Sequence, residues 1–166
     1  NNINVISDGN LNHVFNIILT SINKKISNSG IFSLSDCMNL KEVYLNNIKK
    51  ETLKRLVQIK PLFTWLDEKE DWFTFFSNRN RLSNLVSKAA TSKDALNIDE
   101  LFKKIKNYHR LDNIKYNKKV FISFCKVCFD CELKKDELIF FSSKSKISDY
   151  EGYQGNIVAP NEQKII

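Results

Sequence analysis

The fold expected of this chain is decided by residues 62–82, which read Leu62-Phe63-Thr64-Trp65-Leu66-Asp67-Glu68-Lys69-Glu70-Asp71-Trp72-Phe73-Thr74-Phe75-Phe76-Ser77-Asn78-Arg79-Asn80-Arg81-Leu82. Two aromatic, apolar segments flank the polar run 67–71, and each contains one of the two tryptophans. This arrangement is typical of a β-hairpin with a solvated turn. A new helical pattern opens directly after it, at residues 78–81. The stretch therefore predicts that a hairpin ends one unit and that a second unit begins at once.

The residues before the hairpin predict a first unit over residues 11–77, preceded by a polar lead-in of residues 1–10. From Leu11 to Ile26, apolar residues recur at three- and four-residue steps, as an amphipathic helix requires. Gly30 is a stop signal for this helix. The short alternating segment 31–34 then predicts a small strand.

Two further helices are expected between that strand and the hairpin. Ser35 and Asp36 are predicted to cap the first of them. Its apolar residues are Met38, Val43 and Tyr44. The other helix is expected across residues 49–59, and Pro61 ends it because proline cannot continue a helix.

The same plan is expected in a second unit, residues 78–142, followed by a polar tail, residues 143–166. Its first helix starts near Leu82, and Asn97 and Asn117 are predicted to cap its second and third helices. A second hairpin is predicted from two apolar segments around a polar turn. These segments are residues 129–133 and 137–141, and the turn is residues 134–136.

Helix, short strand, helices and hairpin form the element order of a winged helix. The sequence thus predicts a mainly α fold with small β-hairpins, arranged as tandem winged-helix (helix-turn-helix) units. The two units correspond at an offset of about 65 to 70 residues, so the chain contains an internal repeat. In this alignment Val14 is equivalent to Leu82, and Leu34 is equivalent to Ile98.

The charge balance favours an acidic partner. Lys and Arg outnumber Asp and Glu by 26 to 19, which gives a net charge of +7 and a pI near 9.2, as nucleic-acid-binding proteins often have. No apolar run is long enough to cross a bilayer and no signal peptide is evident. The sequence therefore predicts no membrane association and an intracellular location, cytoplasmic or, in a eukaryote, nuclear. Because the chain begins at Asn1 and its only methionine is Met38, we expect a piece of a longer protein.

Neither a metal site nor an enzyme active site is predicted. Cys125, Cys128 and Cys131 have the spacing C-x-x-C-x-x-C, which occurs in metal sites. Apolar neighbours surround them and no second cysteine pair or nearby histidine completes a site, so we interpret them as core thiols. The chain has two histidines and no recognisable catalytic or phosphate-binding motif. We therefore expect no cofactor and no enzymatic activity in this piece.

A winged helix places its third helix in the major groove and its hairpin wing beside a phosphate strand. The first unit offers a basic third helix but an acidic wing, 67–71, which favours a protein partner or a contact through the helix alone. The second unit is basic on both surfaces, so the sequence favours it as the DNA contact. The candidate DNA-binding residues in these surfaces are Lys49, Lys50, Lys54, Arg55, Lys115, Lys118, Lys119, Lys134 and Lys135.

Arg79 and Arg81 are further candidate DNA-binding residues. They lie where a helix is predicted to start, and a cation there opposes the helix dipole. Two interpretations explain such a position. Either the arginines contact phosphate, or they form structural ion pairs with an acid such as one in the wing 67–71.

Part of the chain, roughly residues 60–141, resembles winged-helix segments that accompany sigma-factor-like helix-turn-helix proteins of bacteria. The resemblance lies in the run from Trp72 to Leu82 with its Arg79-Asn80-Arg81 turn, in the helix ending Tyr108-His109-Arg110, and in the helix over 120–125. It implies a transcription- or DNA-associated module with no catalytic residues.

We therefore expect a DNA-binding tandem winged-helix module of a larger regulatory or transcription-associated protein, with DNA or another nucleic acid as its partner. The alternative is a protein-interaction adaptor that uses the acidic first wing and its aromatic residues to bind another protein or the missing domains of the same chain. Salt dependence distinguishes the two, because phosphate binding weakens steeply with salt whereas an aromatic interface need not.

Overall fold

The computed structural model of the chain describes residues 8–76, 79–111 and 114–146. The start of the predicted lead-in and most of the predicted polar tail lie outside these residues. The first unit contains α1 (Asp8–Ser29), β1 (Phe32–Ser33), α2 (Leu34–Cys37), α3 (Lys41–Leu45), α4 (Lys50–Gln58), β2 (Phe63–Asp67) and β3 (Trp72–Phe75). The second unit contains α5 (Arg81–Ser92), β4 (Ala95–Asn97), α6 (Ile98–Lys106), α7 (Lys118–Cys128), β5 (Cys131–Lys134) and β6 (Glu137–Phe140).

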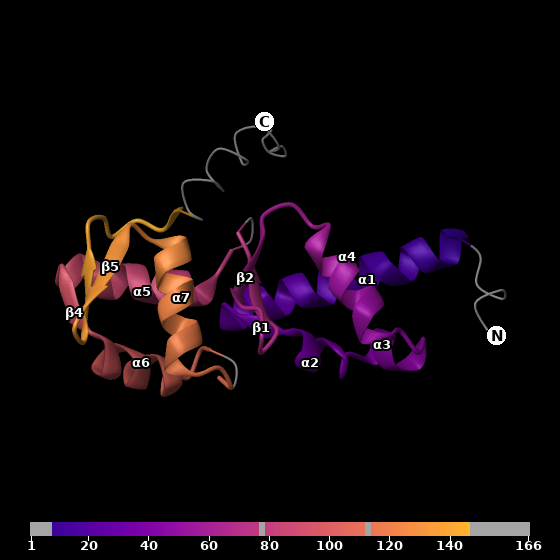
Figure 1. The fold of residues 1–166 in the computed structure, drawn as a ribbon, viewed down its shortest axis with the longest axis horizontal. Coiled ribbons are helices and arrows are strands. Elements are labelled where there is room, and N and C mark those ends of the chain that lie inside the picture. The colour runs from indigo at the N-terminus through magenta and orange to yellow at the C-terminus, as the bar shows by residue number, and fades with distance from the viewer. Residues whose placement is uncertain (1–7, 77–78, 112–113, 147–166) are drawn as a thin grey trace.

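The described residues form an α+β structure with two small antiparallel sheets. The sheets have the strand orders β1-β3-β2 and β4-β6-β5, so in each unit the early strand pairs with the second strand of the hairpin. The pairing is also in equivalent register, because the N–H of Leu34 donates to the carbonyl of Asp71 (3.1 Å) and that of Ile98 to the carbonyl of Asp136 (2.8 Å). Figure 1 shows the two units end to end along the long axis of the molecule.

Each unit buries its own set of apolar side chains. In the first unit, Ile18, Ile22 and Ile26 of α1 are fully buried at four-residue spacing, as expected for one face of a helix. In the second unit the fully or almost fully buried apolar residues of α5 are Leu82, Val86 and Ala90, at the same spacing. The structural repeat therefore matches Ile18 to Leu82. The predicted match of Val14 to Leu82 was wrong by one helical turn, because α1 is longer than α5 and its apolar stripe begins a turn earlier, with Val14 partly buried against the first core.

The predicted caps of the second unit are confirmed. The side-chain oxygen of Asn97 accepts the N–H of Glu100, and that of Asn117 accepts the N–H of Val120, both at 3.0 Å. Each bond satisfies an amide that the first turn of a helix leaves without a backbone partner.

The helix predicted after the first small strand differs from the structure. Ser33, not Ser35, accepts the N–H of Asp36 (3.0 Å), and the segment forms two short helices, α2 and α3, in place of one. The break lets Cys37 and Val43 both face the core, and it leaves Tyr44, one of the apolar residues of the predicted helix, 73% exposed.

Strand β4 was not predicted. Its three residues, Ala95–Asn97, are too few to show an alternating pattern. The strand forms because its backbone pairs with β6 in antiparallel orientation, with Leu96 opposite Leu138 and Asn97 opposite Glu137. The predicted hairpins themselves are confirmed as β2–β3 and β5–β6.

The first hairpin also joins the two units. Leu66 of β2 is buried among the core residues of the second unit, and the ring of Trp72 lies edge-on to that of Tyr116 at 5.9 Å between centroids. The Tyr116 hydroxyl donates to the carbonyl of Ser29 at 3.4 Å, and burial raises the pKa of this phenol well above its usual range. One side of the first hairpin is therefore packed against the second unit, while the residues of its turn, 68–70, remain exposed.

Gly30 ends α1 at the same junction. Its φ of +88° lies in the left-handed region that favours glycine. A Cβ at this position would lie 2.4 Å from the Cβ of Leu82, so glycine is required both for the turn and for the close approach of α5. The Gly30 carbonyl accepts hydrogen bonds from Thr74 (2.9 Å) and from the Asn80 amide (3.1 Å), which tie this turn to β3 and to the start of α5.

Candidate nucleic-acid interface

Helix α4 presents the most open of the predicted basic surfaces. It buries Leu53, Leu56 and Val57 and turns its other side outward. Lys49 and Arg55 are exposed and form no ion pair within the described residues.

The other two predicted cations of this helix are engaged locally. Lys50 forms an ion pair with Asp71 of the wing at 2.5 Å. The Lys54 ammonium lies 5.7 Å from the centre of the Trp65 ring, a distance at which cation–π attraction acts. Of the four predicted cations at α4, the N-cap residue Lys49 and Arg55 therefore remain available to a partner.

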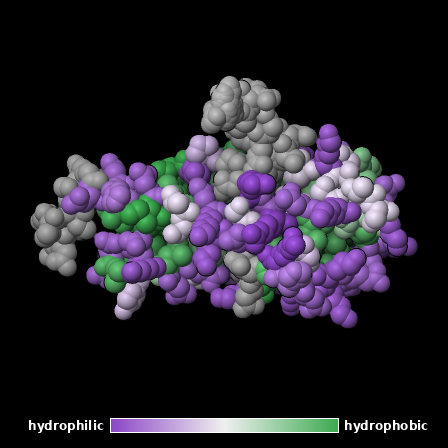
Figure 2. Space-filling view, turned by 180° about the vertical axis from the view of Figure 1, so that it is seen from behind, coloured by the Kyte–Doolittle hydropathy of each residue, from purple (hydrophilic) through white to green (hydrophobic). Residues whose placement is uncertain are grey.

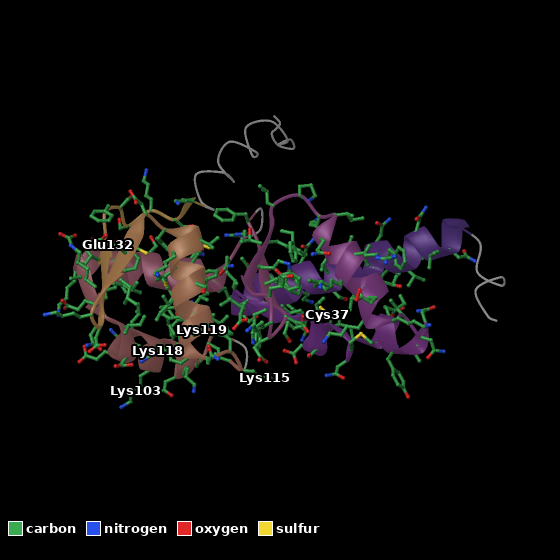
Figure 3. All side chains as sticks on the ribbon, in the orientation of Figure 1. Cys37, Lys103, Lys115, Lys118, Lys119 and Glu132 are labelled. Atoms are coloured by element: carbon green, nitrogen blue, oxygen red, sulfur yellow. The ribbon has the colours of Figure 1, made fainter. Side chains whose placement is uncertain are left out.

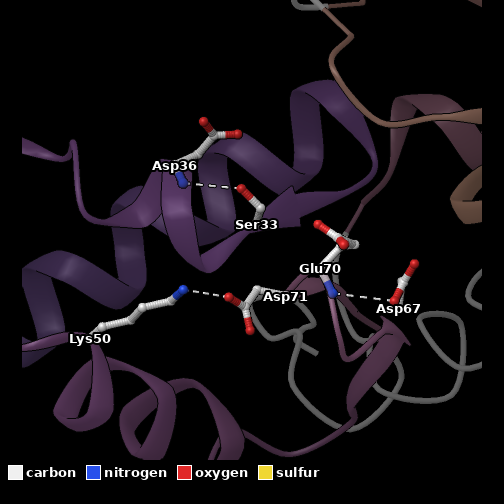
Figure 4. A network of polar contacts seen from close by, with 6 residues as sticks. All are labelled: Ser33, Asp36, Lys50, Asp67, Glu70 and Asp71. Carbon is white, nitrogen blue, oxygen red and sulfur yellow. Dashed lines mark hydrogen bonds and ion pairs between the residues drawn. The ribbon is translucent and has the colours of Figure 1, made fainter.

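The acids of the first wing do not form one exposed patch. Figure 4 shows Asp71 directed toward Lys50, and Asp67 accepting the N–H of Glu70 across the turn at 3.3 Å. The Asp67 side chain is only 9% exposed, whereas Glu68 and Glu70 face solvent. Half of the acidic run that the sequence suggested as a docking surface thus serves the structure of the hairpin.

The first turn of α7 is occupied by contacts within the protein. Lys118 donates to a carboxylate oxygen of Asp99 at 2.6 Å, and this hydrogen bond together with the charge of Asp99 raises the lysine pKa. Lys119 lies 3.9 Å from Asp67 of the first unit. Strand β2 packs beside α7, with Leu66 reaching into the second core. The third helix of the second unit is consequently less open than α4.

The remaining predicted lysines lie in different surroundings. Lys134 pairs with Glu132 at 3.2 Å within its own strand, and Lys135 is exposed at the tip of the hairpin with a positive φ of 55°. Lys115 pairs with Asp36 at 3.5 Å across a cleft of about 480 Å³ between the units. Figure 3 shows Lys103, Lys115, Lys118 and Lys119 on the same side of the molecule.

Arg79 and Arg81 differ from the sequence prediction in their relation to the helix. Asn80 is the N-cap and accepts the N–H of Ser83 at 3.0 Å, so Arg79 precedes α5 and only Arg81 lies in its first turn. Neither arginine pairs with an acid among residues 8–76, 79–111 and 114–146. Arg81 instead donates to the backbone carbonyl of Arg110 at 3.0 Å.

A basic cleft that the sequence analysis did not single out surrounds Arg81. It has a volume of about 190 Å³, and its lining residues are Arg81, Asn84, Leu85, Lys88, Tyr108 and Arg110. The available signal was the density of Lys and Arg after residue 103. It did not indicate that Arg110 returns to α5, because that contact spans 29 residues.

The cysteines lie in the core. Cys37, Cys125 and Cys128 are buried, and burial raises the pKa of each thiol well above its usual range. Cys131 is half-buried and its thiol donates to the Cys125 carbonyl at 3.4 Å; burial raises its pKa to about 11. The described part of the chain has no group of three or more His, Cys, Asp or Glu side chains placed to hold a metal ion.

Comparison with models of protein families, with curated proteins and with solved structures found no match for this chain. No helix of the described segments is both long and apolar enough to span a bilayer.

Proposed function

We propose that the chain is a nucleic-acid-binding module made of two winged-helix units, in which α4 is the helix that contacts DNA. The element order of both units supports this. In each, a strand follows the first helix, a hairpin follows the last, and the early strand pairs with the far strand of the hairpin. This places the last helix, α4 or α7, directly before a wing, as in DNA-binding winged helices.

The observation that carries the proposal is the exposed side of α4. Lys49 and Arg55 supply free cations, and Thr52 and Gln58 are exposed beside them. Cations of this kind hold phosphates, whereas threonine and glutamine side chains can hydrogen-bond to base edges. The protein's net charge of +7 adds attraction for a polyanion.

Two acids of the first wing, Asp67 and Asp71, lie beside lysines of the protein. The wing therefore repels phosphate less than its sequence suggests. Lys50 balances Asp71, and Asp67 faces the second unit. The contact we propose is made by the helix and not by the wing, since Glu68 and Glu70 still repel phosphate at the tip. The second unit then supports the first through β2 and does not insert α7 into a groove.

The alternative function is a protein-interaction adaptor. Tyr44 and Leu45 at the end of α3 favour it, because they are 73% and 60% exposed, and exposed aromatic residues are enriched at interfaces. The aromatic wing itself supports this alternative less, since Trp72 packs against Tyr116. Figure 2 shows apolar residues only as separate small patches on a largely hydrophilic face.

Fluorescence anisotropy tests the proposal. The chain is titrated into labelled duplex and single-stranded DNA at several salt concentrations. Saturable duplex binding whose affinity falls steeply with salt supports DNA recognition, because cations that bind phosphate release counterions. Absence of binding to any nucleic acid at low salt contradicts it and favours the adaptor function.

A further inference from the structure

The geometry points to a phosphate-binding site for a nucleic-acid backbone in the cleft formed by Arg81, Lys88 and Arg110 on the second unit. This inference rests on the proposed function, and it specifies how the second unit takes part although α7 is occupied. The site lies between residues 81–88 of α5 and the turn that follows α6.

The charge of the cleft is unbalanced. Three of its lining residues are cations, the others are Asn84, Leu85 and Tyr108, and none is an acid. In the described ranges, none of the three cations forms an ion pair. Like charges that converge on one small cleft repel one another, and an anion bound between them relieves that repulsion.

Hydrogen bonds to backbone carbonyls hold Arg81 and the turn of Arg110 together. The Arg81 guanidinium donates to the Arg110 carbonyl at 3.0 Å, which fixes the turn against α5. The turn is further held by the N–H of Leu111, which donates to the carbonyl of Tyr108 at 3.2 Å, and by the burial of Leu111 itself. Arg81 also stands at the N-terminal end of α5, where the helix dipole disfavours a cation and favours an anion. A phosphate at this position is attracted by the guanidinium of Arg81 and by the helix dipole.

A second basic cleft continues the first across Tyr108. Its lining residues are Glu100, Lys103, Lys104, Asn107, Tyr108 and His109. Tyr108 belongs to both clefts, and its ring centre lies 5.4 Å from that of His109. Cations on both sides of aromatic rings are typical of surfaces that follow a nucleic-acid backbone. A single phosphoamino acid would fill only the smaller cleft, so the extended surface favours nucleic acid.

The test compares two double variants that each remove two positive charges from the second unit. Lys88→Gln with Arg110→Gln alters the cleft and keeps the backbone carbonyl that Arg81 uses. Lys93→Gln with Lys126→Gln is the matched control, since these exposed lysines of the second unit line neither cleft. Duplex affinity is measured by anisotropy across a salt series, and thermal unfolding verifies that both variants fold.

We expect the cleft variant to bind roughly tenfold more weakly at near-physiological salt and its salt slope to fall by about two, because each lost phosphate contact removes about one unit. The control should change little. If the wild type binds DNA and the cleft variant keeps its affinity and slope, the cleft inference is overturned while the proposed function stands.

If the wild type binds no nucleic acid, both the proposed function and this inference fail. A phosphoserine peptide then serves as the second probe, with amide chemical shifts of residues 81–88 and 108–110 as the readout. Shifts that saturate would reassign the cleft to a phosphorylated protein. Their absence would leave the cleft without an anion-binding role.

Discussion

The ammonium nitrogen of Lys119, on α7, lies 3.9 Å from a carboxylate oxygen of Asp67, on β2, so an ion pair connects the third helix of one unit to the wing of the other. Lys119 is 79% exposed and Asp67 is 9% exposed. Because solvent surrounds the lysine, we expect a coupling free energy below about 1 kcal/mol between the two side chains. A double-mutant cycle of Asp67→Asn and Lys119→Gln, measured by urea unfolding, checks this value.

Asn at position 67 keeps an oxygen that can accept the N–H of Glu70, so the turn itself should persist. A coupling of more than about 2 kcal/mol would be far above that of an exposed pair. It would identify the ion pair, and not the burial of Leu66, as the main link between the units.

Leu66→Ala should destabilise the second unit although the residue belongs to the first hairpin. Leu66 is buried with the core residues of the second unit, so its truncation leaves a cavity there and should cost about 2 to 5 kcal/mol. Native-state hydrogen exchange is the measurement. We expect faster exchange in α7 for Leu66→Ala, whereas the control Leu53→Ala, which opens the first core, should act mainly on α1 and β3. Unchanged protection of α7 in the Leu66 variant would contradict the packing described.

Gly30→Ala should be strongly destabilising, by about 3 kcal/mol or more. Alanine is strained at this positive φ, and its methyl group would also collide with a packed core. The collision is with the Cβ of Leu82, which every residue except glycine possesses. Thermal unfolding compared with Ser27→Ala, a nearby change at the end of the same helix, separates this effect from a loss of helix stability. A Gly30 variant with the midpoint of the wild type would rule out the close approach of α1 and α5.

Local features of the fold could be predicted from the sequence, and features set by contacts distant in sequence could not. The caps Asn97 and Asn117 and both hairpins follow from residue types within a few positions. The burial of Leu66 in the second unit does not, because its neighbours along the chain only predict an alternating strand. The short strand β4 likewise depends on an edge supplied by β6, some forty residues later.

For the candidate site too, the residue types could be predicted from the sequence, but their contacts could not. Basic residues in α4 and α7 could be counted from the sequence, but whether each is available depends on acids elsewhere in the fold. Lys118 is paired with Asp99 and Lys119 with Asp67, whereas Lys49 and Arg55 have no such partner within the structurally described segments. The sequence therefore favoured the second unit for DNA binding, whereas the availability of these side chains leads us to propose α4 as the contact.

The buried thiols predict a loss of stability at alkaline pH. The pKa values of Cys37, Cys125 and Cys128 are raised in the folded protein by burial. Above about pH 8.5 the unfolded chain releases these protons while the folded chain keeps them. Their contribution to stability is therefore complete below that pH and declines as pH rises, by up to about 1.4 kcal/mol per pH unit for each thiol.

Urea unfolding between pH 7.5 and 9.5 measures this decline, and Cys128→Ala should make it shallower whatever its effect at neutral pH. Thiol labelling of the native protein gives a second readout. Cys131, the half-buried thiol, should react first, but slowly, because its pKa is raised to about 11. Rapid labelling of Cys125 or Cys128 under native conditions would be incompatible with their burial.

If α4 is the helix that contacts DNA, neutralising Lys49 and Arg55 together should weaken duplex binding and reduce the salt slope by about two, as each contributes one phosphate contact. A matched variant, Lys24→Gln with Lys93→Gln, removes the same charge from exposed positions outside α4 and should have a smaller effect.

A variant with Lys118, Lys119, Lys134 and Lys135 replaced by glutamine is compared with the Lys49 and Arg55 variant. It removes more charge, and it removes it from the surface that the sequence favoured. Three of these lysines are already paired with acids, so their loss should reduce affinity less per charge than the loss of Lys49 and Arg55. Anisotropy titrations at several salt concentrations provide both quantities. If the four-lysine variant loses the larger share per charge, α7 and the second wing contact the DNA, and the ion pairs with Asp99 and Asp67 must open when it binds.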